Sequence, residues 1–66
     1  MNERVKMDPT AVAEYLDMSY ASIMRLVRNN RIPHFRIGTG KCAHVFFFRD
    51  SIDRWMENLE KQSMAI

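Results

Sequence analysis

Residues 8–33 read DPTAVAEYLDMSYASIMRLVRNNRIP, and this stretch contains start and stop signals for two short helices. Asp8 can cap the first helix, and Pro9 suits its first turn because a backbone N–H there would have no partner within the helix. Ser19 is a second capping residue, and the pair Asn29-Asn30 is a stop signal because asparagine tolerates the left-handed conformation. The stretch therefore predicts a helix over PTAVAEYL, a tight turn, and a second helix from Ser19 to about Asn30.

The apolar residues of each predicted helix fall on one face. In the first helix, Val12 and Leu16 are spaced to form an apolar stripe. In the second helix, Ile23, Leu26 and Val27 share one arc at about 100° per residue and are expected in the core. The opposite arc has no acidic residue and consists of Tyr20, Ala21, Met24, Arg25 and Arg28.

The sequence after the second helix predicts a β-hairpin. The segments HFRIG and HVFFFR are strand-like and flank a loop that contains glycine. Because side chains alternate along a strand, Val45 and Phe47 are expected on the core face and Phe46 on the other face. Phe46 is therefore expected either to cover the small sheet or to contact a partner, while Phe48 is expected to pack under Ile52.

A third helix is expected from Asp50 to about Lys61, with an apolar stripe of Ile52, Trp55, Met56 and Leu59. Its other face is acidic, with Asp53, Glu57 and Glu60.

The order of predicted elements defines the fold class. A short lead-in strand over 4–6 precedes the two helices, the hairpin and the last helix. The expected fold is mainly α with a small β-hairpin, in a single domain over residues 1–66. Residues 1–6 and 62–66 are expected to be flexible ends.

Composition excludes several classes of protein. The 66 residues allow one small domain, and the single cysteine, Cys42, rules out an internal disulfide and favours a reducing cytoplasm. No apolar run approaches the roughly 20 residues that cross a membrane. Cys42, His44 and His34 fall short of any zinc-ligand spacing, and no nucleophile has an adjacent base. We therefore expect no enzyme activity, metal, cofactor or small-molecule ligand.

The charges are segregated along the chain. Residues 18–49 contain six basic residues and no Asp or Glu, whereas the flanking segments contain four basic and eight acidic residues. A surface that is merely solvated usually mixes the two signs. The segregation favours a polyanionic partner, most often nucleic acid, although chance clustering in so short a chain is the alternative.

The run DPTAVAEYLDMSYASIMRLVRNNRIPHFRIG, resumed at FFRDSIDRWM, resembles the small winged-helix excisionases and the DNA-binding heads of MerR-type regulators. The resemblance covers about residues 7–60. It implies a winged helix-turn-helix fold, with the second helix in the major groove of DNA and the hairpin, or wing, over the backbone or minor groove. Asp17 departs from the family pattern, which usually has a turn glycine there. The loop over 38–43 is also longer than the usual wing tip.

Carried over position by position, the resemblance assigns DNA contacts to two groups of residues. On the second, recognition helix these are Tyr20, Ala21, Arg25 and Arg28, and on the wing these are Arg36 and Lys41. Further candidates for DNA contact, which the resemblance does not assign, are Ser22, Met24, Arg31 and His44. Arg31 equally suits the helix dipole at the helix end, and Met24 could instead contact a neighbouring copy. Arg25 and Arg28 could each bond a phosphate or a guanine edge, and Ser19 is expected to cap the helix rather than contact DNA.

The resemblance also implies a function. Excisionases bind and bend DNA near an attachment site and help an integrase to excise a mobile element. The expected partners are double-stranded DNA, an integrase and further copies of the chain on adjacent sites, in the cytoplasm of a bacterium or in a phage-infected cell. MerR-type regulators continue into a long dimerisation helix, so the end of this chain soon after the third helix favours the excisionase interpretation. A small transcriptional regulator, and an interaction module without DNA binding, remain alternatives.

Overall fold

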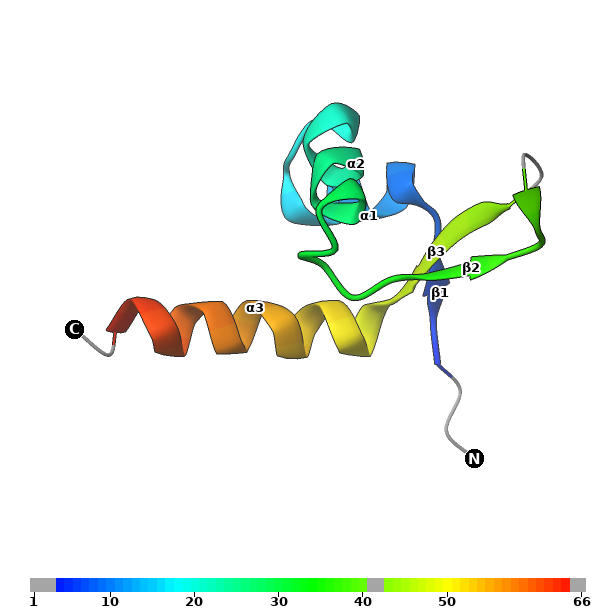
Figure 1. The fold of residues 1–66 in the computed structure, drawn as a ribbon. Coiled ribbons are helices and arrows are strands. Elements are labelled where there is room, and N and C mark those ends of the chain that lie inside the picture. Colours follow the sequence, from blue (N-terminus) through cyan, green and yellow to red (C-terminus); the bar gives the residue numbers. More distant parts are fainter. Residues whose placement is uncertain (1–3, 41–42, 65–66) are drawn as a thin grey trace.

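The computed structural model describes residues 4–40 and 43–64 and contains three helices and a small three-stranded antiparallel sheet (Figure 1). This architecture is the predicted winged helix-turn-helix. No helix in the described ranges is long and apolar enough to cross a membrane. The elements in chain order are β1 (Lys6–Met7), α1 (Pro9–Leu16), α2 (Tyr20–Arg28), β2 (Phe35–Ile37), β3 (His44–Phe48) and α3 (Arg49–Met64).

Both predicted helix starts are confirmed by capping hydrogen bonds. The Asp8 carboxylate accepts a hydrogen bond from the backbone N–H of Ala11 at 2.7 Å. The Ser19 hydroxyl accepts one from the backbone N–H of Ser22 at 3.1 Å. Each bond satisfies an amide that has no partner within the helix. These two caps fix where α1 and α2 begin.

The two helices end in the same way, with one residue in the left-handed conformation. Asp17 has φ 55° after α1, and Asn30 has φ 56° after α2. After α1, the N–H of Met18 bonds to the carbonyl of Ala13 at 2.8 Å, which is the longer bond of a Schellman motif. Asp17 thus has a left-handed backbone conformation, which glycine adopts without steric cost.

Glycine at these two positions is expected to stabilise the fold. Asp17→Gly should raise the free energy of unfolding by up to about 1 kcal/mol, because it removes both the left-handed strain and an anion from a helix C-terminus. Asn30→Gly should give a smaller gain. Chemical denaturation measures both changes. Glu14→Gly, in the regular part of α1, is the control and should lower the stability by about 1 kcal/mol. A loss of stability in Asp17→Gly would show that its carboxylate has a stabilising role.

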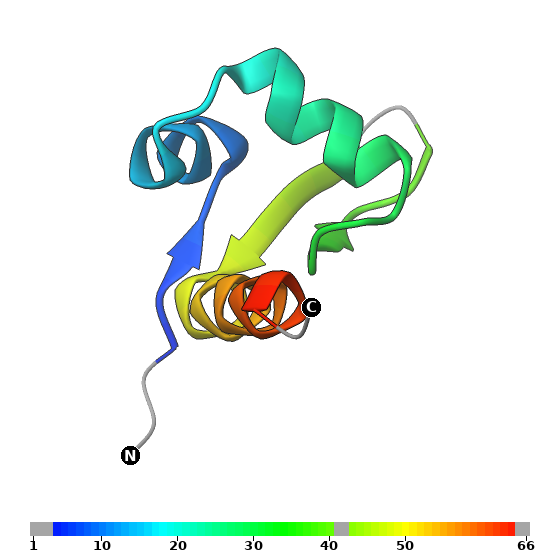
Figure 2. The ribbon, with the colours of Figure 1, turned by 90° about the vertical axis from the view of Figure 1, so that its left-hand side faces the viewer.

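The sheet has the order β1–β3–β2, with both pairs antiparallel. The hairpin of β2 and β3 was predicted. The lead-in strand was predicted over 4–6 but covers Lys6–Met7, so the two ranges share only Lys6. Its pairing with the far end of β3 was not anticipated. Figure 2 shows that α1 and α2 lie on one side of this sheet, while α3 crosses its end.

The core lies between the two helices of the turn motif, the inner face of the sheet and the start of α3. Its largest fully buried side chains are Phe47, Ile23, Ile52 and Val12. Val45 and Leu26 pack against this cluster while partly exposed. The predicted apolar arcs of both helices and the inward direction of Phe47 are therefore confirmed.

Helix α3 is longer and less buried than predicted. It continues to Met64, so part of the expected flexible tail is helical. Trp55 is only partly buried, and Leu59 is 43% exposed. The second half of the helix extends away from the body of the domain (Figure 1). Its apolar stripe therefore contacts the core through its first turns alone.

The outer face of the sheet is aromatic. The Phe35 and Phe48 rings stack with centroids 4.7 Å apart, and Phe35 lies 6.0 Å from Phe46. Phe48 was predicted to pack under Ile52. It lies instead on the outer face, because strand alternation places it with Phe46 and opposite to Phe47.

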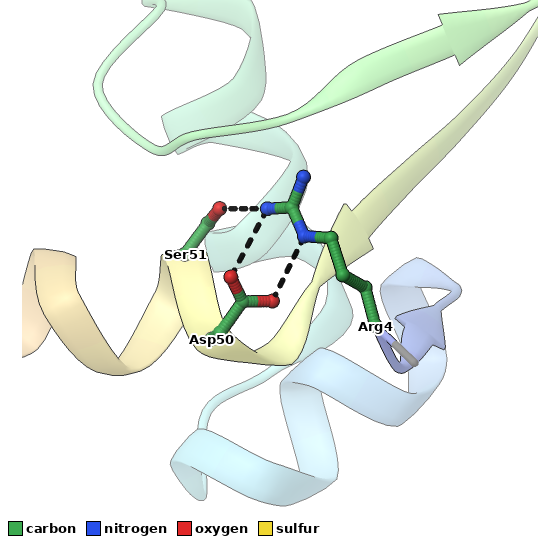
Figure 3. Close-up of polar contacts among 3 residues, drawn as sticks. All are labelled: Arg4, Asp50 and Ser51. Carbon is green, nitrogen blue, oxygen red and sulfur yellow. Dashed lines mark hydrogen bonds and ion pairs between the residues drawn. The ribbon is translucent and has the colours of Figure 1, made fainter. Parts of the chain in front are cut away.

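Arg4 joins this outer face to the start of α3 (Figure 3). Its guanidinium lies 3.8 Å from the Phe48 ring centroid and 3.1 Å from a carboxylate oxygen of Asp50. It also donates a hydrogen bond to the Ser51 hydroxyl at 2.9 Å. Arg4 therefore holds the segment before β1 against the first turn of α3.

Removal of this contact should change the acid sensitivity of the fold. The hydrogen bond from Arg4 lowers the pKa of Asp50 below its ordinary value of 3.8. A lowered pKa stabilises the folded state fully above about pH 4, and this contribution is lost as the pH falls through the folded-state pKa. Arg4→Gln should therefore be less stable than the parent near neutral pH, and the difference should shrink as the pH falls below 3.8. Urea unfolding across this range measures it. A difference that stays constant with pH would assign the effect of Arg4 to its packing on Phe48.

Candidate nucleic-acid interface

Helix α2 presents one side to solvent and the other to the core. Ile23 and Val27 are buried, while Arg25 and Arg28 are exposed on the opposite side. Tyr20, at the start of the helix, is 54% exposed. The helix thus divides into the two arcs that its sequence predicts, and the outward arc contains two guanidinium groups.

These guanidinium groups are available to an external partner. Within residues 4–40 and 43–64, the ion pair that forms is that of Arg4 with Asp50, and neither Arg25 nor Arg28 takes part in one. Helix α2 itself contains no carboxylate. Arginine presents five N–H donors in a planar fork that matches phosphate oxygens and the edge of guanine. The exposed side of α2 therefore presents hydrogen-bond donors whose positive charge is not neutralised by an ion pair within the described residues.

The first turn of α2 is held by two serines. The Ser19 hydroxyl donates to the Ser22 hydroxyl at 2.8 Å, in addition to capping the helix. Ser22, predicted as a DNA contact, is half-buried. Its hydroxyl oxygen accepts the hydrogen bond from Ser19, so its hydroxyl proton remains available for a bond to a ligand. Ala21 beside it is exposed and offers only a methyl group.

A groove of about 400 Å³ separates the start of α2 from the wing. Tyr20 and Met24 line one side of it, and Met24 is partly buried although it lies on the outward arc. Residues 43–46 of the wing line the other side, and Asp8 and Pro9 close one end. The sequence indicated only a capping role for Asp8 and Pro9, because their proximity to β3 depends on the pairing of β1.

The wing residues predicted to bind DNA do not share a face. Arg36 pairs with Val45 and lies on the side of the sheet that faces the helices, whereas His44 pairs with Ile37 and lies on the aromatic side. Both are exposed. Lys41, the third predicted contact, lies outside the described residues. The register therefore places Arg36 and His44 on opposite faces of the wing, and their contact with DNA stays a prediction.

Arg31 lies just beyond the end of a helix that was predicted to run to about Asn30. Helix α2 ends at Arg28, so Arg31 lies in the following loop rather than on the helix. Its backbone N–H bonds to the carbonyl of Leu26 at 2.8 Å and completes the C-terminal motif of α2. Its side chain is exposed. Arg31 can reach a ligand only at the end of the helix.

The acidic residues lie on other elements. Asp53, Glu57 and Glu60 line a shallow surface of α3 together with Met56. The Tyr15 hydroxyl of α1 donates to Asp53 at 2.6 Å, and this bond raises the pKa of Tyr15 above its ordinary value of 10.0. The segregation of charge along the sequence therefore becomes a separation between α2 and α3 in space.

The described residues contain no group of three His, Cys, Asp or Glu side chains that could hold a metal ion. Cys42 lies outside the described ranges. His34, in the loop before β2, has Nδ1 at 2.8 Å from the carbonyl oxygen of Ile32, which fits a local bond with Nδ1 as the donor. His34 thus has a hydrogen-bond partner within its own loop.

Comparison with known proteins identifies the fold family. A family model described as a helix-turn-helix domain matches residues 7–60. The match begins at β1 and runs through α2, the wing and most of α3. No curated protein and no solved structure matches the chain.

Proposed function

The chain belongs to this helix-turn-helix domain family, and we propose on that basis that it binds duplex DNA sequence-specifically through the outward side of α2. The observation that carries the proposal is the pair of exposed arginines, Arg25 and Arg28, on a helix without carboxylates. The major groove of B-DNA, about 12 Å wide, admits a helix of this kind. Either arginine could then bond a guanine edge while the other bonds a phosphate.

The groove between α2 and the wing supports a path for the DNA backbone. With α2 in the major groove, the adjacent sugar-phosphate strand would pass between Tyr20 and residues 43–45 of the wing. Tyr20 supplies a phenol that can bond a phosphate, and Met24 supplies an apolar contact for a sugar or a thymine methyl. Asp8 is the one carboxylate that lines this groove. Its charge is partly offset by the helix N-terminus that it caps.

We assign Arg36 to a phosphate contact, because it lies on the side of the wing that faces the helices. Arg36→Ala should then weaken binding to all sequences alike and reduce the slope of log K against log salt by about one unit. Fluorescence anisotropy over a salt series measures this slope. Lys61→Ala, on the far part of α3, is the control and should leave the slope unchanged. An unchanged slope in Arg36→Ala would remove it from the interface.

The proposed biological role is that of an excisionase-type recombination directionality factor, which binds and bends attachment-site DNA for an integrase. Two considerations support it. The first is the resemblance of the run over 8–38 and of FFRDSIDRWM to that family. The second is size: a single module covers only about 600–1,000 Å² of interface, so useful specificity needs adjacent copies or a partner protein.

Excision of an integrated element in cells with and without the protein tests this role. Excision that depends on the protein supports the directionality factor. If excision is unchanged while transcription near the binding site changes, the protein is a small transcriptional regulator with the same DNA surface. If no salt-dependent binding to any DNA is found, both roles are excluded in favour of a protein-interaction module.

A further inference from the structure

The outer face of the sheet is an apolar surface with a positively charged border. Phe35, Phe46 and Phe48 form its centre, and Ile37 beside them is 50% exposed. Helices α1 and α2 lie on the opposite side of the sheet (Figure 2). An exposed apolar patch of this kind, bordered by polar groups, is typical of an interaction site.

Two cations lie over the rings of this face. The Lys6 ammonium is 4.5 Å from the Phe46 ring centroid, and the Arg4 guanidinium is 3.8 Å from that of Phe48. Arg4 is already paired with Asp50, whereas Lys6 forms no ion pair within the described residues. The net charge that this face offers to a partner is therefore positive and is concentrated at Lys6.

The second half of α3 has the opposite character. On these exposed turns, at about 100° per residue, Glu57, Glu60 and Met64 fall within one arc of the helix. Met64 is 77% exposed, and the helix extends away from the domain in Figure 1. This acidic, methionine-bearing surface thus protrudes from the domain and is accessible to a second molecule.

We infer that the outer face of the sheet, formed by Phe35, Phe46, Phe48 and Lys6, is a docking site for the α3 helix of a second copy of this chain. The α3 helix of a second copy fits this site because of charge complementarity, since its carboxylates would lie against Lys6. Methionine side chains also make favourable contacts with aromatic rings. The contact joins two different surfaces, so it is head-to-tail and can repeat along a row of molecules.

Neither surface includes the outward side of α2, so docking leaves the arginines of α2 free. The inference deepens the proposed function, on which its biological use rests, because it names the surfaces through which copies on adjacent DNA sites would meet. The association itself is a property of the chain alone. It can therefore be measured without DNA.

A charge-reversal experiment tests the inference. Lys6→Glu and Glu57→Lys are purified separately, and self-association is measured by analytical ultracentrifugation without DNA, up to about 1 mM, where weak contacts are detected. Each variant alone should associate at least about fivefold more weakly than the parent, because one surface has become repulsive. An equimolar mixture should regain association, since both kinds of mixed contact again pair opposite charges. Recovery in the mixture would also show that each variant is folded.

A matched control makes the same charge change away from both surfaces: Glu14→Lys, on α1, should associate like the parent. The inference is overturned if the parent stays monomeric throughout, or if the mixture is no stronger than the separate variants. It is also overturned if Lys6→Glu loses affinity for a single-site duplex as strongly as Arg25→Ala, because the face would then contact DNA. A failure of the proposed function would instead appear as a parent that associates but binds no DNA.

Discussion

Replacement of Arg25 by alanine is expected to weaken specific DNA binding by roughly 1–3 kcal/mol, which is about 5- to 150-fold in Kd. The side chain is exposed, points away from the core and forms no ion pair within the described residues. Its loss should therefore leave the free energy of unfolding within about 0.5 kcal/mol of the parent. Titration of a cognate duplex, with a thermal melt of the free protein, measures both quantities.

The pattern across sequences separates the two kinds of contact. If Arg25 bonds a guanine edge, the loss should be large on the cognate duplex and small on one with that base pair changed. An equal loss of affinity on both duplexes would mean that Arg25 contacts a phosphate and would make Arg28 the base contact. Arg54→Ala, an exposed arginine of α3, is the matched control and should bind as the parent does.

Phe47→Ala should have the largest effect on stability, a loss of about 3–5 kcal/mol. Phe47 is fully buried at the centre of the core, between the two helices and the start of α3. A domain of this size has a total stability of roughly 3–10 kcal/mol, so the variant should be largely unfolded near 37 °C. Far-UV circular dichroism and urea unfolding measure the change.

The neighbouring ring supplies the control. Phe46 lies on the outer face and is only half-buried, so Phe46→Ala should lose about 1 kcal/mol and remain folded. Equal losses in the two variants would mean that the outer face is as important to the fold as the core. That result would contradict a docking role for the aromatic surface.

The local features of the fold were predictable because their signals are local. Asp8 and Ser19 act through amides three residues away, and Asn30 acts through its own backbone conformation. The inward arcs of the two helices follow from the 3.6-residue period alone. These features account for the helix-turn-helix and for the outward position of Arg25.

The features that were missed depend on contacts between distant residues. Whether Arg36 and His44 share a face is decided by the register across the wing, which the sequence of a long loop does not fix. The pairing of Lys6 with Phe48 joins segments at opposite ends of the chain. Helix α3 continues to Met64 because no glycine or proline stops it, although the polar run before Met64 resembled a flexible tail. The groove beside Tyr20 arises from all of these placements together.

The most direct measurement of the central claim is a map of backbone amide chemical-shift changes when the protein binds a duplex selected from a random pool. The largest shifts should fall on residues 20–28 and on the wing near Arg36 and His44. The second half of α3 should be unaffected on a duplex with a single site. Shifts concentrated on α3, or no selected duplex at all, would contradict the assignment of α2 as the DNA-binding helix.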